Sequence, residues 1–223
     1  MIKKVSIITT TYNKNNALDN TLTGLMKQNI PFPYEICIVD DASDVSPEPI
    51  IRKHIPNNIL KFKRLEKNVG PVEANTESYK LASKESDVFV TMGGDIILLD
   101  TDGIEKLCNG VGEGIFTIGE VKTLDIESNM YENWDNEVNR LKSLYNGLHT
   151  YLTVFCGSLK PDRWYIFLGA FRREEAEKAR IFESWDVNYK GYLTELKYKP
   201  VFPIVKSIHQ SHPSRLYKGH GTD

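Results

Sequence analysis

The chain has 223 residues, of which 26% are charged and 40% hydrophobic, and its net charge is −2. These values are typical of a globular protein and exclude a disordered, collagen-like or coiled-coil chain. They also exclude a general nucleic-acid binder, which needs a basic face, and the three scattered cysteines suggest neither a disulfide scaffold nor a CxxC metal site.

The first 95 residues or so alternate between short β-branched runs, which predict strands, and amphipathic stretches, which predict helices. The predicted strands are Val5–Thr9, Glu35–Val39, Lys61–Leu65 and Asp87–Met92. The predicted helices are 18–26 with Asn15 as its cap, Ile50–Ile55 and Glu73–Ser83.

The second half of the chain has fewer clear signals. The predicted strands are Gly114–Val121, Tyr151–Cys156, Tyr165–Phe171 and Val201–His209. The predicted helices are a short one at Thr101–Asn109, a long one after Met130 capped by Asn129 or Ser128, Arg172–Phe182 and Tyr189–Leu196. Because no linker, repeat or low-complexity tract occurs, we interpret residues 1–223 as one domain with two halves, 1–100 and 101–223.

Polar side chains follow each of the four strands predicted in the first half. The alternation predicts an α/β fold with a mostly parallel sheet and helices on both faces. In such sheets ligands bind beyond the carboxyl ends of the strands. The polar residues at these four ends are Thr10 and Tyr12, Asp40 and Asp41, Asn68 and Gly70, and Asp95. The sequence therefore predicts a ligand site at this edge of the sheet.

These stretches together resemble the family-2 glycosyltransferases with a GT-A fold. The matching segments are VSIITTTYN, EICIVDDAS, NVGPVEAN, DVFVTMGGDIIL, SWDVNYKGYLTELKYKP and HQSHP. The resemblance implies an inverting enzyme that moves a sugar from a nucleoside diphosphate to a hydroxyl group. The sequence departs from the family pattern at Gly93-Gly94-Asp95, where two acidic residues are usual, and at Trp185, where a glutamate is usual.

The resemblance places the nucleotide at the strand ends of the first half. Asp41 is expected to accept the base N–H, with Asp40 beside it, although Asp-Ala-Ser is also good turn chemistry. Thr10 and Tyr12 flank the base unless Tyr12 is simply packed. The residues expected along the ribose and diphosphate are Asn68, Gly70, Asn75 and Gly94.

A divalent cation, Mn²⁺ or Mg²⁺, is implied on the diphosphate, where it would act as a Lewis acid. We predict Asp95 and His209 as its ligands, with a helix cap and an ordinary strand-end histidine as the respective alternatives. A literal Asp-x-Asp occurs at Asp100-Thr101-Asp102, but it follows an apolar run, so we interpret Asp100 as the cap of the helix after it.

An inverting transferase needs one carboxylate to accept the proton of the attacking hydroxyl. Asp186 is the predicted general base and Glu183 the rival, while a helix cap is the structural alternative for Asp186. His212 and His220 are interpreted as solvated tail residues, and Arg215 and Lys218 as a basic tail.

The resulting hypothesis is a metal-dependent glycosyltransferase that uses a nucleotide-sugar donor, a UDP-sugar first, and a saccharide or polysaccharide acceptor. The resemblance suggests surface-polysaccharide assembly. The alternative is a non-catalytic nucleotide-sugar or carbohydrate-binding protein of the same fold. No apolar run is long enough to span a bilayer, so we expect a cytoplasmic protein that can work at a membrane surface, with homo-oligomerisation left open.

Overall fold

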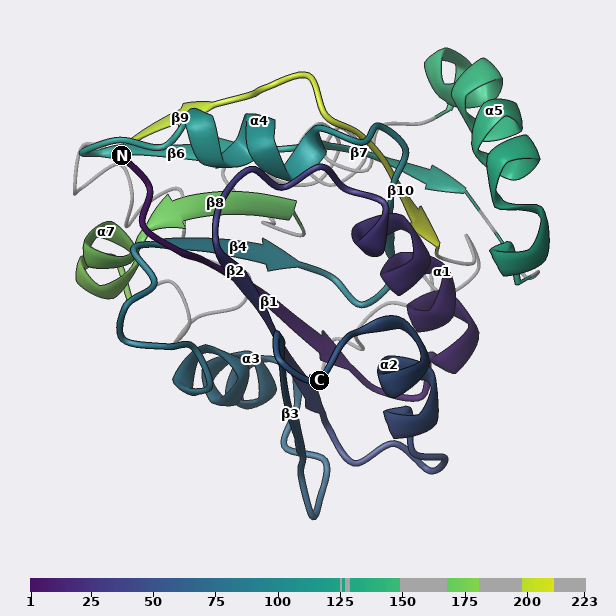
Figure 1. The fold of residues 1–223 in the computed structure, drawn as a ribbon, viewed down its shortest axis with the longest axis horizontal. Coiled ribbons are helices and arrows are strands. Elements are labelled where there is room, and N and C mark those ends of the chain that lie inside the picture. Colours follow the sequence, from purple (N-terminus) through teal and green to yellow (C-terminus); the bar gives the residue numbers. More distant parts are fainter. Residues whose placement is uncertain (125, 127–128, 149–167, 181–197, 211–223) are drawn as a thin grey trace, which may run out of the picture.

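The computed structural model describes residues 1–124, 126, 129–148, 168–180 and 198–210. A seven-stranded sheet runs through it in the order β3-β2-β1-β4-β8-β6-β9 (Figure 1). Its strands are β1 (Val5–Thr11), β2 (Tyr34–Asp40), β3 (Leu60–Arg64), β4 (Val88–Met92), β6 (Ile115–Ile118), β8 (Leu168–Arg172) and β9 (Lys199–Val201). The four strands from the first half are parallel, as predicted, whereas β8 is antiparallel to both of its neighbours.

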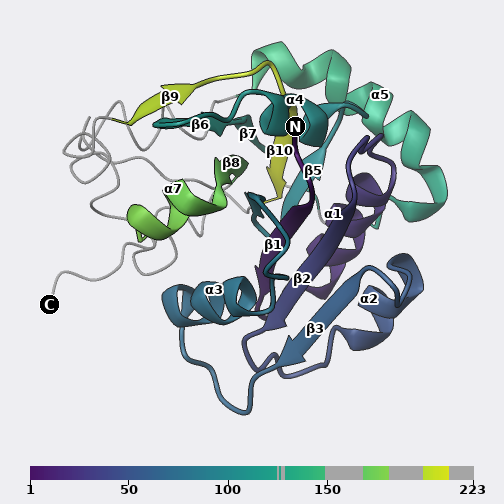
Figure 2. The same ribbon diagram turned by 60° about the vertical axis from the view of Figure 1, so that its left-hand side comes forward.

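Helices cover both faces of this sheet (Figure 2). The helices are α1 (Asn15–Met26), α2 (Glu48–His54), α3 (Pro71–Lys80), α4 (Gly103–Asn109), α5 (Trp134–Leu144) and α7 (Arg173–Lys178), with 3₁₀ turns η1 (Tyr131–Asn133) and η2 (Tyr145–Gly147). Adjacent residues of β1 face opposite sides: Ile7 packs in the core beneath α1, and Ile8 packs in the core beneath α3 and α7. This two-sided burial explains why the strands are continuous apolar runs.

A second sheet of three strands lies beside the main one, in the order β5-β10-β7. Its strands are β5 (Ile96–Leu98), β7 (Glu120–Leu124) and β10 (Lys206–Gln210). Strand β10 is antiparallel to β5 and parallel to β7, so the end of the described chain lies against the segment that follows β4. This sheet therefore joins the two halves of the chain next to the predicted site.

Two predicted strands are each divided in two. The segment Gly114–Val121 forms β6 and β7, which break at Gly119 and belong to different sheets. A Cβ at Gly119 would lie 2.6 Å from Leu168 Cδ2, so a larger residue at the break would require the Leu168 side chain to move. Likewise, Val201–His209 is not one strand but the end of β9, a connection and most of β10.

Two predicted helix caps, Asn15 and Asp100, were wrong. Helix α1 begins after Lys14, and the Asn15 side chain donates instead to the Val45 carbonyl at 3.3 Å. Helix α4 begins at Gly103, and Asp100 pairs with Lys142 at 3.2 Å. The 3₁₀ turn η1 precedes α5, which begins at Trp134. The Asn129 side chain accepts a bond from the Tyr131 N–H of that turn at 2.8 Å, and Ser128, the other predicted cap, lies outside the described residues.

The predicted strand Tyr165–Phe171 is confirmed in its described part by β8, and the predicted helix Arg172–Phe182 is confirmed over α7, which ends at Lys178 before a turn at residues 179–180. The predicted strand Tyr151–Cys156 and helix Tyr189–Leu196 lie outside the described residues. Among the described helices, none combines the length and the apolar character that crossing a bilayer requires.

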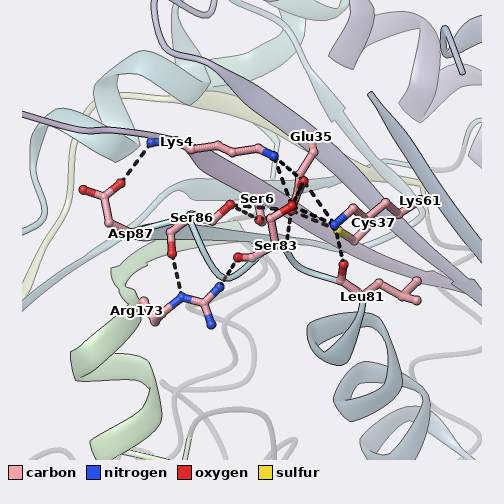
Figure 3. A network of polar contacts seen from close by, with 10 residues as sticks. All are labelled: Lys4, Ser6, Glu35, Cys37, Lys61, Leu81, Ser83, Ser86, Asp87 and Arg173. Carbon is pink, nitrogen blue, oxygen red and sulfur yellow. Dashed lines mark hydrogen bonds and ion pairs between the residues drawn. The ribbon is translucent and has the colours of Figure 1, made fainter. Parts of the chain in front are cut away.

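A buried carboxylate, Glu35, ties together the amino ends of the central strands (Figure 3). It is 3% exposed and accepts hydrogen bonds from Ser6 Oγ at 2.7 Å and from the Ser83 N–H at 2.6 Å. It also forms ion pairs with Lys4 at 2.6 Å and Lys61 at 3.4 Å. Burial alone raises the pKa of Glu35, but the bonds from Lys4, Ser83 and Ser6 outweigh it and lower the pKa to about 2.

We predict that Glu35→Gln lowers the free energy of unfolding by about 1–3 kcal/mol, because it leaves buried donors and cations without their acceptor. Since the folded-state pKa is depressed, the contribution of Glu35 is complete above about pH 4.5 and is lost as the pH falls toward 2. Urea unfolding as a function of pH measures both effects.

Glu77→Gln is the matched control, because Glu77 pairs with Lys63 and Lys80 at the surface. Its effect should stay below about 1 kcal/mol. An equal loss for the two variants, or the same pH profile for wild type and Glu35→Gln, would show that the Glu35 network is not the stabilising element.

Candidate functional site

The candidate site lies at the carboxyl ends of the parallel strands, where the loop that follows β4 meets β10. The loop Gly93–Asp95 connects β4 to β5, and its turn is closed by a bond from the Ile96 N–H to the Gly93 carbonyl at 3.2 Å. The Gln210 N–H donates to the Asp95 carbonyl at 2.9 Å. The backbone of β10 therefore holds the loop that carries Asp95.

Asp95 and His209, the two predicted metal ligands, come together in the structure. His209 on β10 is opposite Ile96 on β5, and its Nε2 lies 3.3 Å from Asp95 Oδ2. Both residues are 5% exposed. Their proximity was predicted; whether they bind a metal stays a prediction.

Sequence reasoning missed Lys14, whose ammonium group contacts the same oxygen, Asp95 Oδ2. Burial raises the pKa of Asp95, but the hydrogen bond from His209 and the charges of His209 and Lys14 outweigh it and hold that pKa below its usual value. The available signal was the position of Lys14, two residues after Tyr12 in the loop that follows the first strand.

Gly94 brings the loop into close contact with the end of β1. A Cβ at this position would lie 2.5 Å from the carbonyl oxygen of Thr10, which no real contact permits. The Gly94 carbonyl in turn accepts a bond from Thr21 Oγ1 at 3.2 Å. The backbone therefore has no room for a side chain at position 94, and Asp95 is the single carboxylate of the Gly93–Asp95 loop.

We predict that Gly94→Ala destabilises the fold by about 1–3 kcal/mol, because the loop must move away from the Thr10 carbonyl. Thermal or urea unfolding measures the change. Gly147→Ala is the control, since a Cβ there meets nothing within 4 Å, and it should change stability by no more than about 0.5 kcal/mol. Equal stability of the two variants would contradict the close approach.

Polar residues on the buried side of α1 support this loop. Asn20 Nδ2 donates to Gln210 Oε1 at 2.9 Å, and Gln210 Nε2 donates to the Ala17 carbonyl at 3.0 Å and to Thr21 Oγ1 at 3.2 Å. Because these side chains are buried, their pairing fixes α1 against β10. The predicted apolar stripe of α1 gave no indication of this polar contact.

The two aspartates at the carboxyl end of β2, Asp40 and Asp41, both accept hydrogen bonds from the protein itself. Asp41 accepts bonds from the Val69 N–H at 2.8 Å and the Gly70 N–H at 3.0 Å, so it holds the loop before α3. Asp40 is fully buried and accepts a bond from the Ser43 N–H at 3.1 Å, which is turn chemistry. A carboxylate has about four acceptor positions, so Asp41 retains capacity for a further donor.

The other predicted nucleotide residues are spread around this edge. Tyr12 is 45% exposed and follows β1, so its ring is open to a ligand. Asn68 is exposed and donates to the Asp41 carbonyl at 3.3 Å. Gly70 precedes α3 with a φ of 87°, a conformation that favours glycine, whereas Asn75 lies within α3 rather than at a strand end.

The predicted base Asp186, its rival Glu183 and the neighbouring Trp185 lie outside the described residues, as do His212 and His220. The described part of the chain contains no group of three or more metal-ligating side chains. Asp95 and His209 are nevertheless a chemically suitable pair, because Mg²⁺ and Mn²⁺ often take few protein ligands and complete their shell with phosphate oxygens and water.

A comparison with protein families shows the family to which the chain belongs. The profile of the family described as "Glycosyl transferase family 2" matches residues 6–167, most of the chain. The chain belongs to glycosyl transferase family 2. The matched region includes β1, β2, β4 and the Asp95 loop, so the predicted edge of the sheet lies within the family-2 domain.

Two curated relatives agree with this family-2 membership. The poly(ribitol-phosphate) beta-N-acetylglucosaminyltransferase TarP of Staphylococcus aureus is 27% identical over 150 residues, which are 57% of this chain and 45% of TarP. The uncharacterized glycosyltransferase YwdF of Bacillus subtilis is 31% identical over 131 residues, 56% of this chain and 44% of YwdF. The matched part thus spans less than half the length of either relative.

Solved structures show that the family-2 chain has the GT-A fold predicted for it. Staphylococcus aureus TarS in complex with UDP aligns with a TM-score of 0.62 and 16% identity, over 96% of this chain and 62% of that one. The mannosyltransferase PcManGT from Pyrobaculum calidifontis, in complex with GDP-Man and Mn²⁺, aligns with a TM-score of 0.60 and 16% identity, over 96% and 58% of the two chains.

Proposed function

We propose that this family-2 glycosyltransferase moves a sugar from a nucleoside-diphosphate donor, a UDP-sugar, to a hydroxyl group of a saccharide or polymer acceptor, with inversion. The observation that carries the proposal is the buried carboxylate of Asp95 at the end of β4, with an imidazole and an ammonium group on the same oxygen. The names of TarP and of the UDP-bound TarS support the choice of donor.

Residues 1–100 are proposed as the donor half. The exposed ring of Tyr12 would stack against the base, and Thr10 would flank it. Asp41 would accept the base N–H on an oxygen that already fixes the Val69–Gly70 loop. The Asp41 carboxylate is thus held in place before the nucleotide binds, so binding loses little side-chain entropy at Asp41.

A divalent cation is proposed at Asp95, with His209 as a second ligand after a small ring movement and the donor phosphates as the rest of the shell. Such an ion supplies Lewis-acid stabilisation of the leaving diphosphate. The protein contributes the buried, pre-positioned carboxylate and, through the bond from β10 to the Asp95 carbonyl, the fixed loop that carries it.

Residues 101–223 are proposed as the acceptor half, with Asp186 as the general base. A carboxylate there would accept the proton of the acceptor hydroxyl as its oxygen attacks the anomeric carbon and the nucleoside diphosphate leaves from the opposite face. Glu183 is the other carboxylate close by in the sequence.

Donor binding is the first expected outcome. UDP with Mn²⁺ should raise the melting temperature of the wild-type protein, because a ligand of the native state alone stabilises it. Asp95→Asn keeps the side-chain size but removes the charge, so the extra stabilisation by Mn²⁺ should disappear. A Mn²⁺-dependent shift of equal size in Asp95→Asn would contradict the metal site, and GDP serves as the control for the choice of base.

Turnover is the second expected outcome. UDP-GlcNAc is chosen because the name of TarP specifies N-acetylglucosamine and the TarS structure holds UDP. With Mn²⁺ present it should be hydrolysed slowly to UDP and GlcNAc, water replacing the acceptor hydroxyl, whereas binding without release of UDP would favour a non-catalytic module. Asp186→Asn should reduce turnover by about 10²–10⁴-fold, the range for a lost general base, with UDP affinity unchanged. Glu183→Gln is the matched control, and a reversed order of the two effects would assign the base to Glu183.

A further inference from the structure

We propose that Lys14 is a cation for the donor's diphosphate: it leaves Asp95 when the donor binds and pairs with the phosphates, so that UDP binds this protein without a divalent metal ion. This inference rests on the proposed donor site. It adds to that site a residue that the sequence did not single out, and it assigns the residue a ligand of defined chemistry, a diphosphate.

The first support is where the ammonium group lies. Lys14 contacts Asp95 Oδ2, the oxygen on which a bound cation is expected. The Lys14 side chain is 44% exposed, whereas the side chains of Asp95 and His209 are each 7% exposed. Lys14 is therefore the member of this group that an incoming donor can reach, and its long flexible stem can turn toward the phosphates.

The second support is the charge of the site. The Gly93–Asp95 loop carries one carboxylate where the family pattern has two, and the Thr10 carbonyl leaves no room for a side chain at Gly94. The positive charge of Lys14 balances that single negative charge. A divalent cation is attracted less by such a neutral pair than by two free carboxylates, whereas a diphosphate is attracted by the ammonium group.

The third support is the position of Lys14 along the chain. It is the residue that precedes the first turn of α1, and no acidic residue lies in that turn. The start of a helix favours negative charge, so a phosphate beside the start of α1 would be attracted both by the helix end and by the Lys14 ammonium group. Among the described residues, Asp95 is the single acidic partner of Lys14.

The movement of Lys14 from Asp95 to the phosphates leaves room for a divalent metal ion at Asp95, so the ammonium group and the metal ion can act together. When Lys14 turns to the phosphates, Asp95 Oδ2 keeps His209 as a neighbour and becomes available to a divalent ion. A metal would then strengthen donor binding that Lys14 has already made possible. The structure thus predicts metal-stimulated rather than metal-requiring binding of a nucleoside diphosphate.

The test is calorimetric titration with UDP and with uridine in EDTA. Wild-type protein should bind UDP without metal. Lys14→Met removes the charge but keeps an apolar side chain, and it should weaken UDP binding about tenfold or more, the loss expected for one charge-assisted contact. Uridine lacks phosphates, so its affinity should be the same in wild type and variant.

Lys14→Arg and Lys27→Met are the companion variants. Lys14→Arg restores the charge and should recover most of the UDP affinity. Lys27 is the next lysine along the chain, just beyond the end of α1, with a 47% exposed side chain, and Lys27→Met should bind UDP as the wild type does. Circular dichroism of each variant verifies that it is folded.

Three results would overturn the inference: UDP binding by wild type that requires Mn²⁺, equal UDP affinity of wild type and Lys14→Met in EDTA, or an equal loss of uridine affinity in that variant. The first needs no variant, so a misfolded Lys14→Met leaves the inference testable. If wild type binds neither UDP nor UDP-GlcNAc even with Mn²⁺, the proposed function fails as well. Failure of the Lys14 inference alone is therefore distinguishable, because UDP then still binds with Mn²⁺.

Discussion

The candidate site depends on one constraint, the burial of the Asp95 carboxylate. A charge removed from water must be paired, and Asp95 is paired with a histidine from β10 and a lysine from the loop before α1. Satisfying that charge therefore brings together three segments that are distant along the chain. The backbone also connects two of these segments, because the Gln210 N–H of β10 donates to the Asp95 carbonyl.

The two ends of the parallel strands use buried carboxylates differently. At the amino ends, Glu35 is surrounded by hydroxyl groups and lysines, and its pKa of about 2 indicates a group that remains ionised and paired. At the carboxyl ends, Asp95 is paired with the buried His209 and the partly exposed Lys14. The first arrangement holds the amino ends of the strands together, and the second is where we propose that a diphosphate takes Lys14 from Asp95.

The Gly93–Asp95 loop departs from the family pattern because it carries a single carboxylate, Asp95. The loop lies against the Thr10 carbonyl and is held by Thr21, so position 94 has no space for a side chain. Loss of a carboxylate reduces the attraction for a divalent ion, and a lysine at the remaining carboxylate changes the site in the same direction. The loss of one carboxylate and the presence of Lys14 thus both make the Asp95 loop less negative.

The sequence by itself determined the α/β class, the four parallel strands and the strand ends that carry Asp41 and Asp95, because alternating strand and helix patterns admit few topologies. It also indicated that His209 belongs to the same site. Only the tertiary structure decided that Lys14 meets Asp95, that Asp41 holds the Val69–Gly70 loop, and that the chain breaks at Gly119 into two sheets. These features depend on contacts between distant segments, whereas the periodicity of a sequence reports only which face of its own element a residue occupies.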